Sequence, residues 1–503
     1  MQGKQRYLKG IEDDGSGLPT ISYDLKRLKG DLTLEEIGAR SLRPLKFAEL
    51  LPFSGLEESS LGEGGTPLVS LDEWGAQNGC PRLLMKDEAF NPTGSIEDRG
   101  FLVAVTGARK SGREAICLAS GGNSAASAAA YAARCGLTAQ LFLTEQVPDE
   151  IVKQCQSFGA VLQVVEGGLS MAQESLEEML EDGWSDLSGE RDPLRVEGVK
   201  TIAYEIAEAL DWRAPDVLVC PTGSGRTVLA VIKGFRELAE LGWLKGGLPR
   251  IVAVQPEGCQ PVVRAYREEA GLSMERNPFM DAELDEENLQ DALLKDRASD
   301  FVDQDDPHFT DEGMEDELMG VLARQFEVER VELESENIDE KLIRREDLRY
   351  MISRELVPYR DTGEKVLVAM VDPLDFSALD EMKQFFQKEI EARLCSRRAF
   401  RRVMGRISES FGFLQSEALN LLVPRPLFMD QILKALADTG GLALAVSEKE
   451  IASMRRAIAL EEGVQLSAEG AAGLAAVRRL AVQGSLNKDD TVVVINPGSG
   501  YKY

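Results

Sequence analysis

An alanine-rich stretch, LASGGNSAASAAAYAARCGL, occupies residues 118–137. Alanine has the highest helix propensity, and a glycine pair ahead of Asn123 is typical of a turn that opens a helix, so a helix is predicted from Asn123 onward. The apolar runs LFLTE (141–145) and VLQVVE (161–166) follow. Short apolar runs separated by helical stretches predict a mainly parallel sheet with helices on both faces.

The same alternation continues on both sides of an acidic central region. DVLVCP (216–221) and RIVAVQP (250–256) are predicted strands before it, and TVVVIN (491–496) is a predicted strand after it. We therefore predict an α/β fold with a two-lobed, doubly wound parallel-sheet body made of residues 1–270 and 416–503. Ligands of such sheets bind at the carboxyl ends of the strands, so a ligand site is expected between the lobes.

Residues 271–331 differ from the body in charge. Within them, residues 281–320 hold 16 acidic residues, and their only basic residues are Lys295 and Arg297. A block of like charges is typical of a solvated connector, because its members repel one another and cannot be buried together. An acidic docking segment for a basic partner is the alternative.

Residues 332–412 are predicted to form a second, smaller domain. ELVPYRDTGEKVLVAMVDP (355–373) predicts two strands joined by a turn at Thr362-Gly363, FSALDEMKQFFQ (376–387) predicts a helix, and EIEARLC (389–395) predicts a third strand. Surface loops tolerate long insertions at small entropic cost, so we expect a small α/β domain inserted into the body.

The composition excludes several classes of protein. The chain has 57 basic and 86 acidic residues, a net charge of −29, which disfavours binding to nucleic acid or to anionic membranes. The first residues have no apolar leader, and no apolar run approaches the roughly 18 residues of a membrane span. Seven scattered cysteines without CxxC spacing predict a reduced, cytoplasmic protein. The single histidine, His308, and the lack of a ligand cluster predict no metal site.

Five segments together resemble one enzyme family. They are the alanine-rich stretch, SLGEGGTPLVSL (60–71), LLMKDEAFNPTGSIEDRG (83–100), EGVKTIAYEIAEALDWRAPDVLVCPTGSGRTVLAVIKGF (197–235) and VVVINPGSGYKY (492–503). The chain resembles threonine synthase, one of the fold-type-II enzymes that use pyridoxal phosphate. The resemblance implies the conversion of O-phosphohomoserine and water into threonine and phosphate. We also expect a homo-oligomer.

The resemblance assigns cofactor contacts to individual residues. In the family a lysine forms an imine with the aldehyde of the cofactor, a glycine-rich turn binds the phosphate, and polar side chains contact the ring. The positions that keep the family pattern are Asn123, Ser124, Gly223, Ser224, Gly225 and Ser499.

The sequence departs from the family pattern at three places among the cofactor contacts. The family motif PTGSFKDRG reads PTGSIEDRG here, so Glu97 stands where the imine-forming lysine is expected. The phosphate turn continues with Arg226-Thr227 instead of Gly-Asn, and Pro497 replaces the residue whose hydroxyl bonds the pyridine nitrogen. A carboxylate cannot form an imine, and at about 5 Å it would repel the phosphate by roughly 3 kcal/mol per charge pair at an effective dielectric constant near 20. Covalent attachment of pyridoxal phosphate is therefore not expected.

Three interpretations of the function remain open. The first is a pseudoenzyme whose insertion engages a protein partner. The second is an altered but active lyase that uses another lysine or a non-covalently bound cofactor. The third is a sensor in which Arg226 and helix N-terminal amides bind phosphate or a small anionic metabolite. We predict an ion pair between Glu97 and Arg226 that fills the pocket; the alternative is that both side chains face solvent.

The insertion has a resemblance of its own. LVPYRDTGEKVLVAMVDPLDFSALDEM (356–382) resembles the N-terminal domain of type II secretion and pilus-assembly ATPases, which docks to a protein partner. This resemblance implies a protein partner for residues 332–412. A basic run follows on a predicted helix, where it is either a solvated face or a docking patch: Arg397, Arg398, Arg401 and Arg402.

Overall fold

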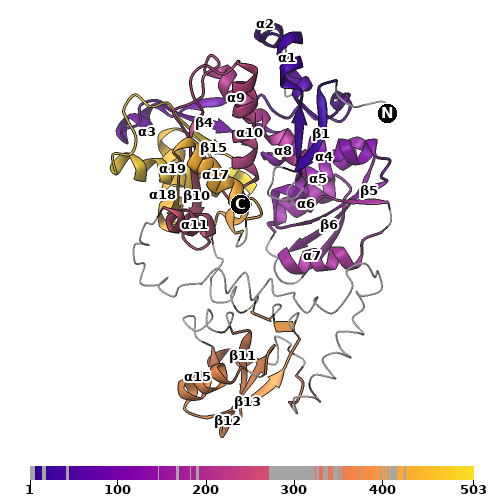
Figure 1. Ribbon diagram of the computed structural model, residues 1–503, viewed down its shortest axis with the longest axis vertical. Helices are drawn as coiled ribbons and strands as arrows, with labels where there is room; N and C mark the ends of the chain where they lie inside the picture. Colours follow the sequence, from indigo (N-terminus) through magenta and orange to yellow (C-terminus); the bar gives the residue numbers. More distant parts are fainter. Residues whose placement is uncertain are drawn as a thin grey trace. The chain divides into compact units, whose positions relative to one another are not determined.

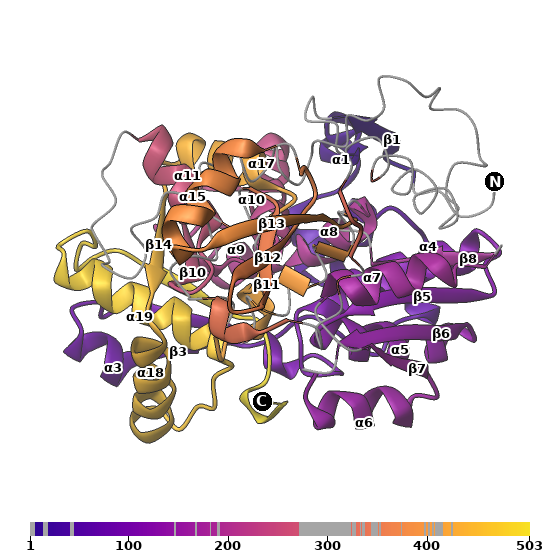
Figure 2. The same ribbon diagram turned by 90° about the horizontal axis from the view of Figure 1, so that it is seen from below.

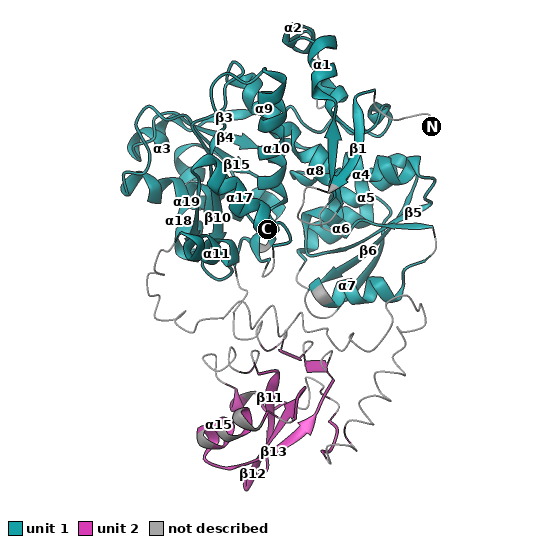
Figure 3. Cartoon of the chain, viewed as in Figure 1, with its two compact units in different colours: residues 1–274, 415–503 teal, residues 275–414 magenta. Residues whose placement is uncertain are grey.

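The computed structural model of the chain describes most of residues 6–502. It leaves out 14–18, 41–44, 145–146, 166–168, 182, 189–191 and 424–425. Between 271 and 415 it describes 323, 328–331, 333, 338–343, 351, 354–373, 375–396, 399–400, 403–404 and 407. The acidic block, His308 and the basic run of four arginines lie outside the described residues, so the expectations about them stay predictions. The chain divides into two compact units, Met1–Met274 with Gln415–Tyr503, and Glu275–Leu414 (Figure 3).

The larger sheet of the first unit has six strands in the order β14-β10-β9-β15-β4-β3 (Figure 1). Their bounds are β14 Leu442–Val446, β10 Arg250–Pro256, β9 Val217–Pro221, β15 Val492–Asn496, β4 Leu83–Asp87 and β3 Leu68–Ser70. All neighbours run parallel except β3, which pairs antiparallel with β4. The predicted parallel sheet is thus confirmed, with one antiparallel edge strand in addition.

Helices cover both faces of this sheet, because alternate residues of each strand point to opposite sides. One face packs Leu218 and Ile251 against α9 (Thr201–Ala209), α10 (Arg226–Leu241), α11 (Pro261–Glu269) and α17 (Met429–Thr439). The other face packs Val219 and Val252 against α3 (Asp72–Gln77), α18 (Glu448–Glu461) and α19 (Ala468–Val482). The strands are therefore buried on both sides.

The smaller sheet has four parallel strands in the order β7-β6-β5-β8. They are β5 Ala115–Ser120, β6 Thr138–Thr144, β7 Val161–Val165 and β8 Trp184–Asp186. One face packs against α4 (Glu97–Lys110), α5 (Asn123–Cys135) and α6 (Asp149–Ser157), and the other against α7 (Leu169–Glu178). Figure 2 shows α6 and α7 on opposite sides of this sheet. The two-lobed α/β architecture is confirmed.

Shorter elements complete the first unit. A hairpin of β1 (Leu8–Asp13) and β2 (Pro19–Tyr23) is followed by α1 (Leu25–Asp31) and α2 (Leu34–Gly38), and α8 spans Pro193–Val199. Single 3-10 turns include η3 (Glu88–Phe90), η8 (Leu419–Leu421) and η9 (Gly500–Lys502).

The second unit is inserted in the crossover between β10 and β14, two strands that lie side by side in the larger sheet. It contains β11 (Leu356–Asp361), β12 (Lys365–Met370), α15 (Phe376–Phe386) and β13 (Glu389–Leu394). β11 pairs antiparallel with β12, which pairs parallel with β13. Buried residues such as Val357, Val368 and Met382 give this unit a hydrophobic core of its own.

Candidate functional site

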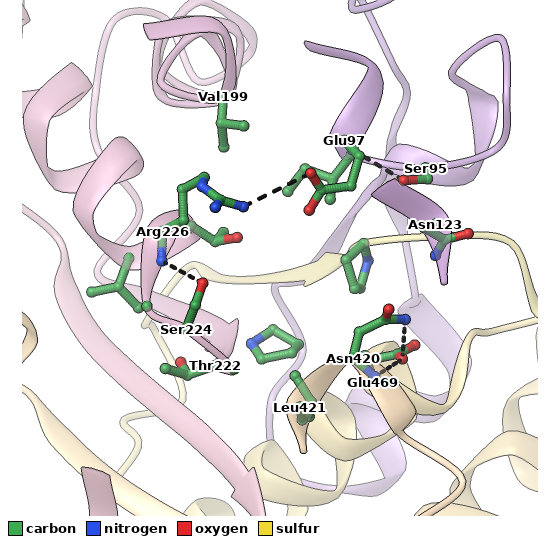
Figure 4. Close-up of a pocket in the computed structure, with 17 residues that line it drawn as sticks. Ser95, Glu97, Asn123, Val199, Thr222, Ser224, Arg226, Asn420, Leu421 and Glu469 are labelled. Atoms are coloured by element: carbon green, nitrogen blue, oxygen red, sulfur yellow. Dashed lines mark hydrogen bonds and ion pairs between the residues drawn. The ribbon is translucent and has the colours of Figure 1, made fainter. Parts of the chain in front are cut away.

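A pocket of about 80 Å³ lies between the two lobes of the first unit (Figure 4). Its walls come from the segments that follow β9, β15 and β5, so it lies at the carboxyl ends of strands from both sheets, where doubly wound folds bind ligands. The lining residues that sequence analysis singles out are Glu97, Asn123, Gly223, Ser224, Gly225, Arg226, Thr227 and Pro497. The other two predicted residues, Ser124 and Ser499, are outside the lining.

The turn after β9 needs glycine for steric reasons. A Cβ on Gly223 would lie 2.4 Å from the carbonyl oxygen of Asn420. Gly225 has φ +94°, a left-handed conformation, and a Cβ there would lie 2.3 Å from Ile432. The turn therefore brings the backbone close to its neighbours and leads directly into α10.

Three long helices begin at this pocket. Glu97 is the first residue of α4, Asn123 of α5 and Arg226 of α10, helices of 14, 13 and 16 residues. Unpaired backbone N–H groups and the helix dipoles make such ends favourable for negative charge. A carboxylate of the protein itself, Glu97, already lies among them.

The Glu97 carboxylate forms ion pairs with two arginines. Its Oε2 accepts a short hydrogen bond from Nη2 of Arg195 and lies 3.9 Å from Nη1 of Arg226 (Figure 4). The predicted Glu97–Arg226 pair is therefore present, and the alternative in which both side chains face solvent is wrong. Only 10 % of the Arg226 side chain and 22 % of the Glu97 side chain are exposed.

Arg195 is the closer partner, and helix packing places it there. α8 crosses α4 with so little separation that a Cβ on Gly198 would lie 1.8 Å from the carbonyl oxygen of Arg99. Next to this crossing, the Arg195 guanidinium lies 4.4 Å from the centre of the Phe101 ring. Its Nη2 also donates to Ser124 Oγ at 3.0 Å, so Ser124 contacts the cluster although it is outside the pocket lining.

Charge balance keeps Glu97 ionised. Burial opposes ionisation, but Arg195 and Arg226 outweigh it, and the pKa of the Glu97 carboxyl lies below its ordinary value. The Glu97 backbone N–H donates to Ser95 Oγ at 3.0 Å, which fixes the first turn of α4. Glu97, the residue that the resemblance aligns with a lysine, is therefore a paired, ionised carboxylate.

No lysine is among the described residues that line the pocket. Lys86, in the segment LLMKDEAFNPTGSIEDRG (83–100), is paired outside the pocket lining: its Nζ donates to Glu205 Oε2 at 2.7 Å and to the carbonyl oxygen of Thr66 at 2.6 Å. Pro497 and Ser499, the two predicted cofactor contacts near the C-terminus, flank Gly498 in sequence. Pro497 reaches the pocket, whereas the backbone N–H of Ser499 donates to the carbonyl oxygen of Gly94 at 3.0 Å.

Two residues of the site, Arg195 and Glu469, are not predicted from the sequence. Arg195 lies outside the motifs, and only the need of a partly buried Glu97 for a cation would have pointed to it. Glu469 lines the pocket from the first turn of α19, where its Oε1 accepts from Asn420 Nδ2 at 2.7 Å.

Among the described residues no group of His, Cys, Asp or Glu could hold a metal ion. Within the same part of the chain, no helix is both long and apolar enough to cross a membrane.

Comparison with known proteins finds a family match for each of the two units. The profile of the family described as "Pyridoxal-phosphate dependent enzyme" matches residues 59–300 and 401–498, and that of the MshEN domain matches residues 326–412. A crystal structure of a fungal L-serine ammonia-lyase from Rhizomucor miehei has a similar fold, with a TM-score of 0.50 at 14 % identity. The match covers 86 % of this chain and 93 % of that chain.

Curated relatives include two archaeal threonine synthases. The protein from Methanocaldococcus jannaschii is 36 % identical over 258 residues, 50 % of this chain and 63 % of the relative. The one from Methanosarcina acetivorans is 35 % identical over 264 residues, 52 % of this chain and 64 % of the relative. The chain thus spans less than two thirds of the length of these relatives. It belongs to the fold-type-II pyridoxal-phosphate dependent enzymes, with threonine synthases among its homologues and an inserted MshEN domain.

Proposed function

We propose that this protein is a non-catalytic member of its family that binds a small phosphate-bearing metabolite in the pocket. The observation that carries the proposal is the Arg195–Glu97–Arg226 cluster. By the resemblance, Glu97 corresponds to the imine-forming lysine of the family. A carboxylate has no nucleophilic nitrogen, and both of its neighbours are guanidiniums, which are also poor nucleophiles because they stay protonated.

The residues of the pocket fit only part of pyridoxal phosphate. The glycine turn at the start of α10 suits a phosphate, and Asn123 at the start of α5 offers an amide. The imine position holds Glu97, and Pro497 offers no side-chain donor or acceptor to a ring nitrogen. These groups do not fit a covalently bound cofactor.

Anion binding has its own support in the pocket. Arg226 carries a guanidinium at the first position of α10, and Ser224 Oγ lies 3.5 Å from its backbone nitrogen. Bidentate guanidinium contacts suit phosphate, and the helix N-terminus adds backbone donors. We expect the phosphate to lie over Gly223, Ser224 and Gly225, with Arg226 turning from Glu97 toward it.

The first experiment measures the family reaction. The full chain, incubated with pyridoxal phosphate and O-phosphohomoserine, is expected to form no threonine above the protein-free blank, while the Methanocaldococcus jannaschii relative serves as the positive control. Threonine formation by this chain would overturn the proposal and favour an altered, active lyase.

The second experiment measures binding of inorganic phosphate by calorimetry. Arg226→Met is expected to weaken binding about tenfold or more, since a charge-assisted contact is lost. Arg236→Met is the matched control, because Arg236 lies on the same helix with 42 % of its side chain exposed and pairs with Asp438. Equal affinities for the two variants would contradict anion binding at this turn.

We also propose that the inserted MshEN domain engages a protein partner. Its separate hydrophobic core and its place in one crossover support this, because such a module can be attached without altering the sheet. Replacing residues 326–412 by a short flexible linker is expected to leave phosphate affinity unchanged and to abolish association with a purified candidate partner. Association that survives the replacement would refute the assignment.

A further inference from the structure

β7 (Val161–Val165) is one edge of the smaller sheet (Figure 2). Among the described residues β6 is its one strand partner, so those backbone N–H and C=O groups of β7 that point away from β6 have no strand to pair with. Val161 is 51 % exposed and Val164 is 59 % exposed, although valine side chains are usually buried. The outer side of β7 therefore offers both backbone groups and apolar side chains.

The described strands at the other sheet edges carry protection against such pairing. β3 and β8 have three residues each, and β14 has four of its five residues buried. The hairpin has three charged residues in β1 and a proline at the start of β2, while β11 contains a proline and β13 contains three charged residues. Short length, burial, proline and charge are the features that keep edge strands from pairing. β7 has none of them.

The sequence of β7 is complementary to itself. An antiparallel pair with the β7 of a second copy, centred on Gln163, aligns all five residues of the strand. Val161 then lies opposite Val165, and on the other face of the sheet Leu162 lies opposite Val164. Each apolar side chain meets an apolar one, and the two Gln163 amides can hydrogen-bond to each other across the axis. Moving the centre by one residue leaves ends unpaired, so the strand specifies this register.

Charge favours a second copy of the chain over a basic partner at this edge. The strand and the three residues before it, FGAVLQVV (158–165), contain no charged residue. The chain has a net charge of −29, so two copies repel each other over most of their surface and can approach best where the surface is uncharged. A basic partner gains nothing from an uncharged strand, because its attraction is to the acidic surface elsewhere.

We propose that two copies of this protein associate through β7, so that their two smaller sheets become one continuous sheet across a two-fold axis. The proposal gives the expected homo-oligomer a surface and does not depend on what the pocket binds. Five strand residues on each side are far fewer than the roughly 20–30 of a standard interface. The dimer is therefore weak, with a Kd on the order of 100 μM.

Sedimentation of the full chain over a concentration series that brackets this Kd tests the proposal. Val164→Lys puts two charges into the ladder and is expected to raise the Kd of the dimer about tenfold or more. Val482→Lys is the matched control, because Val482 is an 83 % exposed valine at the end of α19, and its Kd should equal that of the parent. Both variants should keep the circular dichroism spectrum and melting temperature of the parent. A parent that stays monomeric throughout, or a dimer that the two variants affect equally, would overturn the inference.

Disulfide trapping tests the register, since all the native cysteines are buried. Gln163→Cys brings two thiols together at the axis, with Cα atoms about 5 Å apart, whereas Val161→Cys leaves them about 13 Å apart. On oxidation, Gln163→Cys is expected to form the covalent dimer at least about tenfold faster, and equal rates would refute the two-fold ladder.

Salt separates a second copy from a partner held by opposite charge. Raising the sodium chloride concentration from about 50 to about 500 mM screens the repulsion between two acidic chains, so the dimer should tighten severalfold. A dimer that salt weakens would be held by opposite charges and would contradict association through an uncharged strand.

Discussion

Two charged residues on the first turn of α4, Glu97 and Arg99, lie in contrasting clusters. Arg99 is fully buried, and its guanidinium donates to Glu88, Glu205 and the hydroxyls of Thr66 and Thr201, with heavy-atom distances of 2.6–3.1 Å. Glu97 faces the pocket, and its partner Arg195 has a buried Nε without an acceptor among the described residues. The first cluster is closed and fully paired; the second is open on one side.

This contrast indicates different roles for the two clusters. In the closed cluster, burial is outweighed by the cations, so the pKa of Glu205 falls to about 2 and these charges persist at any ordinary pH. Such a network joins β4, α4 and α9 and acts as part of the scaffold. In the open cluster one carboxylate is shared by two guanidiniums, so an incoming anion can compete for Arg226.

Arg99→Met should have the largest effect. Removing the guanidinium leaves Glu88 and Glu205 buried without their main cation, which costs about 3–5 kcal/mol of the free energy of unfolding. Chemical denaturation measures this loss. Arg455→Met, which removes a partly exposed pair with Glu417, is the control and should cost less than about 1 kcal/mol. Similar losses for both variants would show that the closed cluster is not part of the scaffold.

Asp98, which lies between Glu97 and Arg99 in sequence, should give the next largest effect. Its carboxyl accepts from Thr93 and Ser127, yet burial raises its pKa to about 6 from an ordinary value of 3.8. The folded state therefore binds the proton more tightly, and this stabilisation is present below pH 3.8 and lost as the pH rises through 6. The parent is expected to lose about 3 kcal/mol relative to Asp98→Asn between these limits. Parallel stability–pH curves for the two proteins would refute this.

Glu97→Gln tests the open cluster, with a smaller effect. The amide cannot neutralise Arg195 and Arg226, so the free energy of unfolding should fall by about 1–3 kcal/mol in phosphate-free buffer. Arg226, no longer paired with a carboxylate at position 97, should bind inorganic phosphate about tenfold more tightly, a difference of about 1.4 kcal/mol. Glu450→Gln, which breaks a pair with Arg479 outside the pocket, should leave the phosphate affinity unchanged. Weaker phosphate binding by Glu97→Gln would mean that Glu97 supports the site instead of competing for it.

Ser224→Ala should have the smallest effect. It removes one hydroxyl from the turn before α10 and leaves both clusters intact, so the free energy of phosphate binding is expected to weaken by about 0.5–1.5 kcal/mol. Calorimetry on the parent, Ser224→Ala and Ser157→Ala makes the comparison, because the Ser157 hydroxyl bonds its own helix on an exposed surface. An unchanged affinity would place the phosphate away from this hydroxyl.

The sequence alone predicts the helices and strands that have a distinctive local pattern of residues. Apolar runs such as DVLVCP and RIVAVQP became central strands, and the alanine-rich stretch became α5, because buried parallel strands and helices have distinctive compositions. The antiparallel edge strand β3 is too short for such a signal. Which strands are neighbours depends on long-range pairing that no local pattern records.

The pocket was predictable only in part. The family motifs predict the residues of the turn before α10. They also predict the Glu97–Arg226 pair, because the resemblance assigns both residues to the same cofactor pocket. They do not predict Arg195, since it reaches the site through the close packing of α8 on α4. Compartment, oligomeric state and partner stay predictions.

The position of β15 has a consequence for biosynthesis. This strand lies between β9 and β4 in the middle of the larger sheet, although it follows all the other described strands along the chain. During translation, β4 and β9 emerge long before β15 and would have to wait for it with unpaired edges, while the inserted unit, whose strands are near one another in sequence, can fold at once. A nascent chain stalled before β15 is thus expected to expose two unpaired strand edges and to require a chaperone, and the emergence of β15 would complete the larger sheet in one cooperative step.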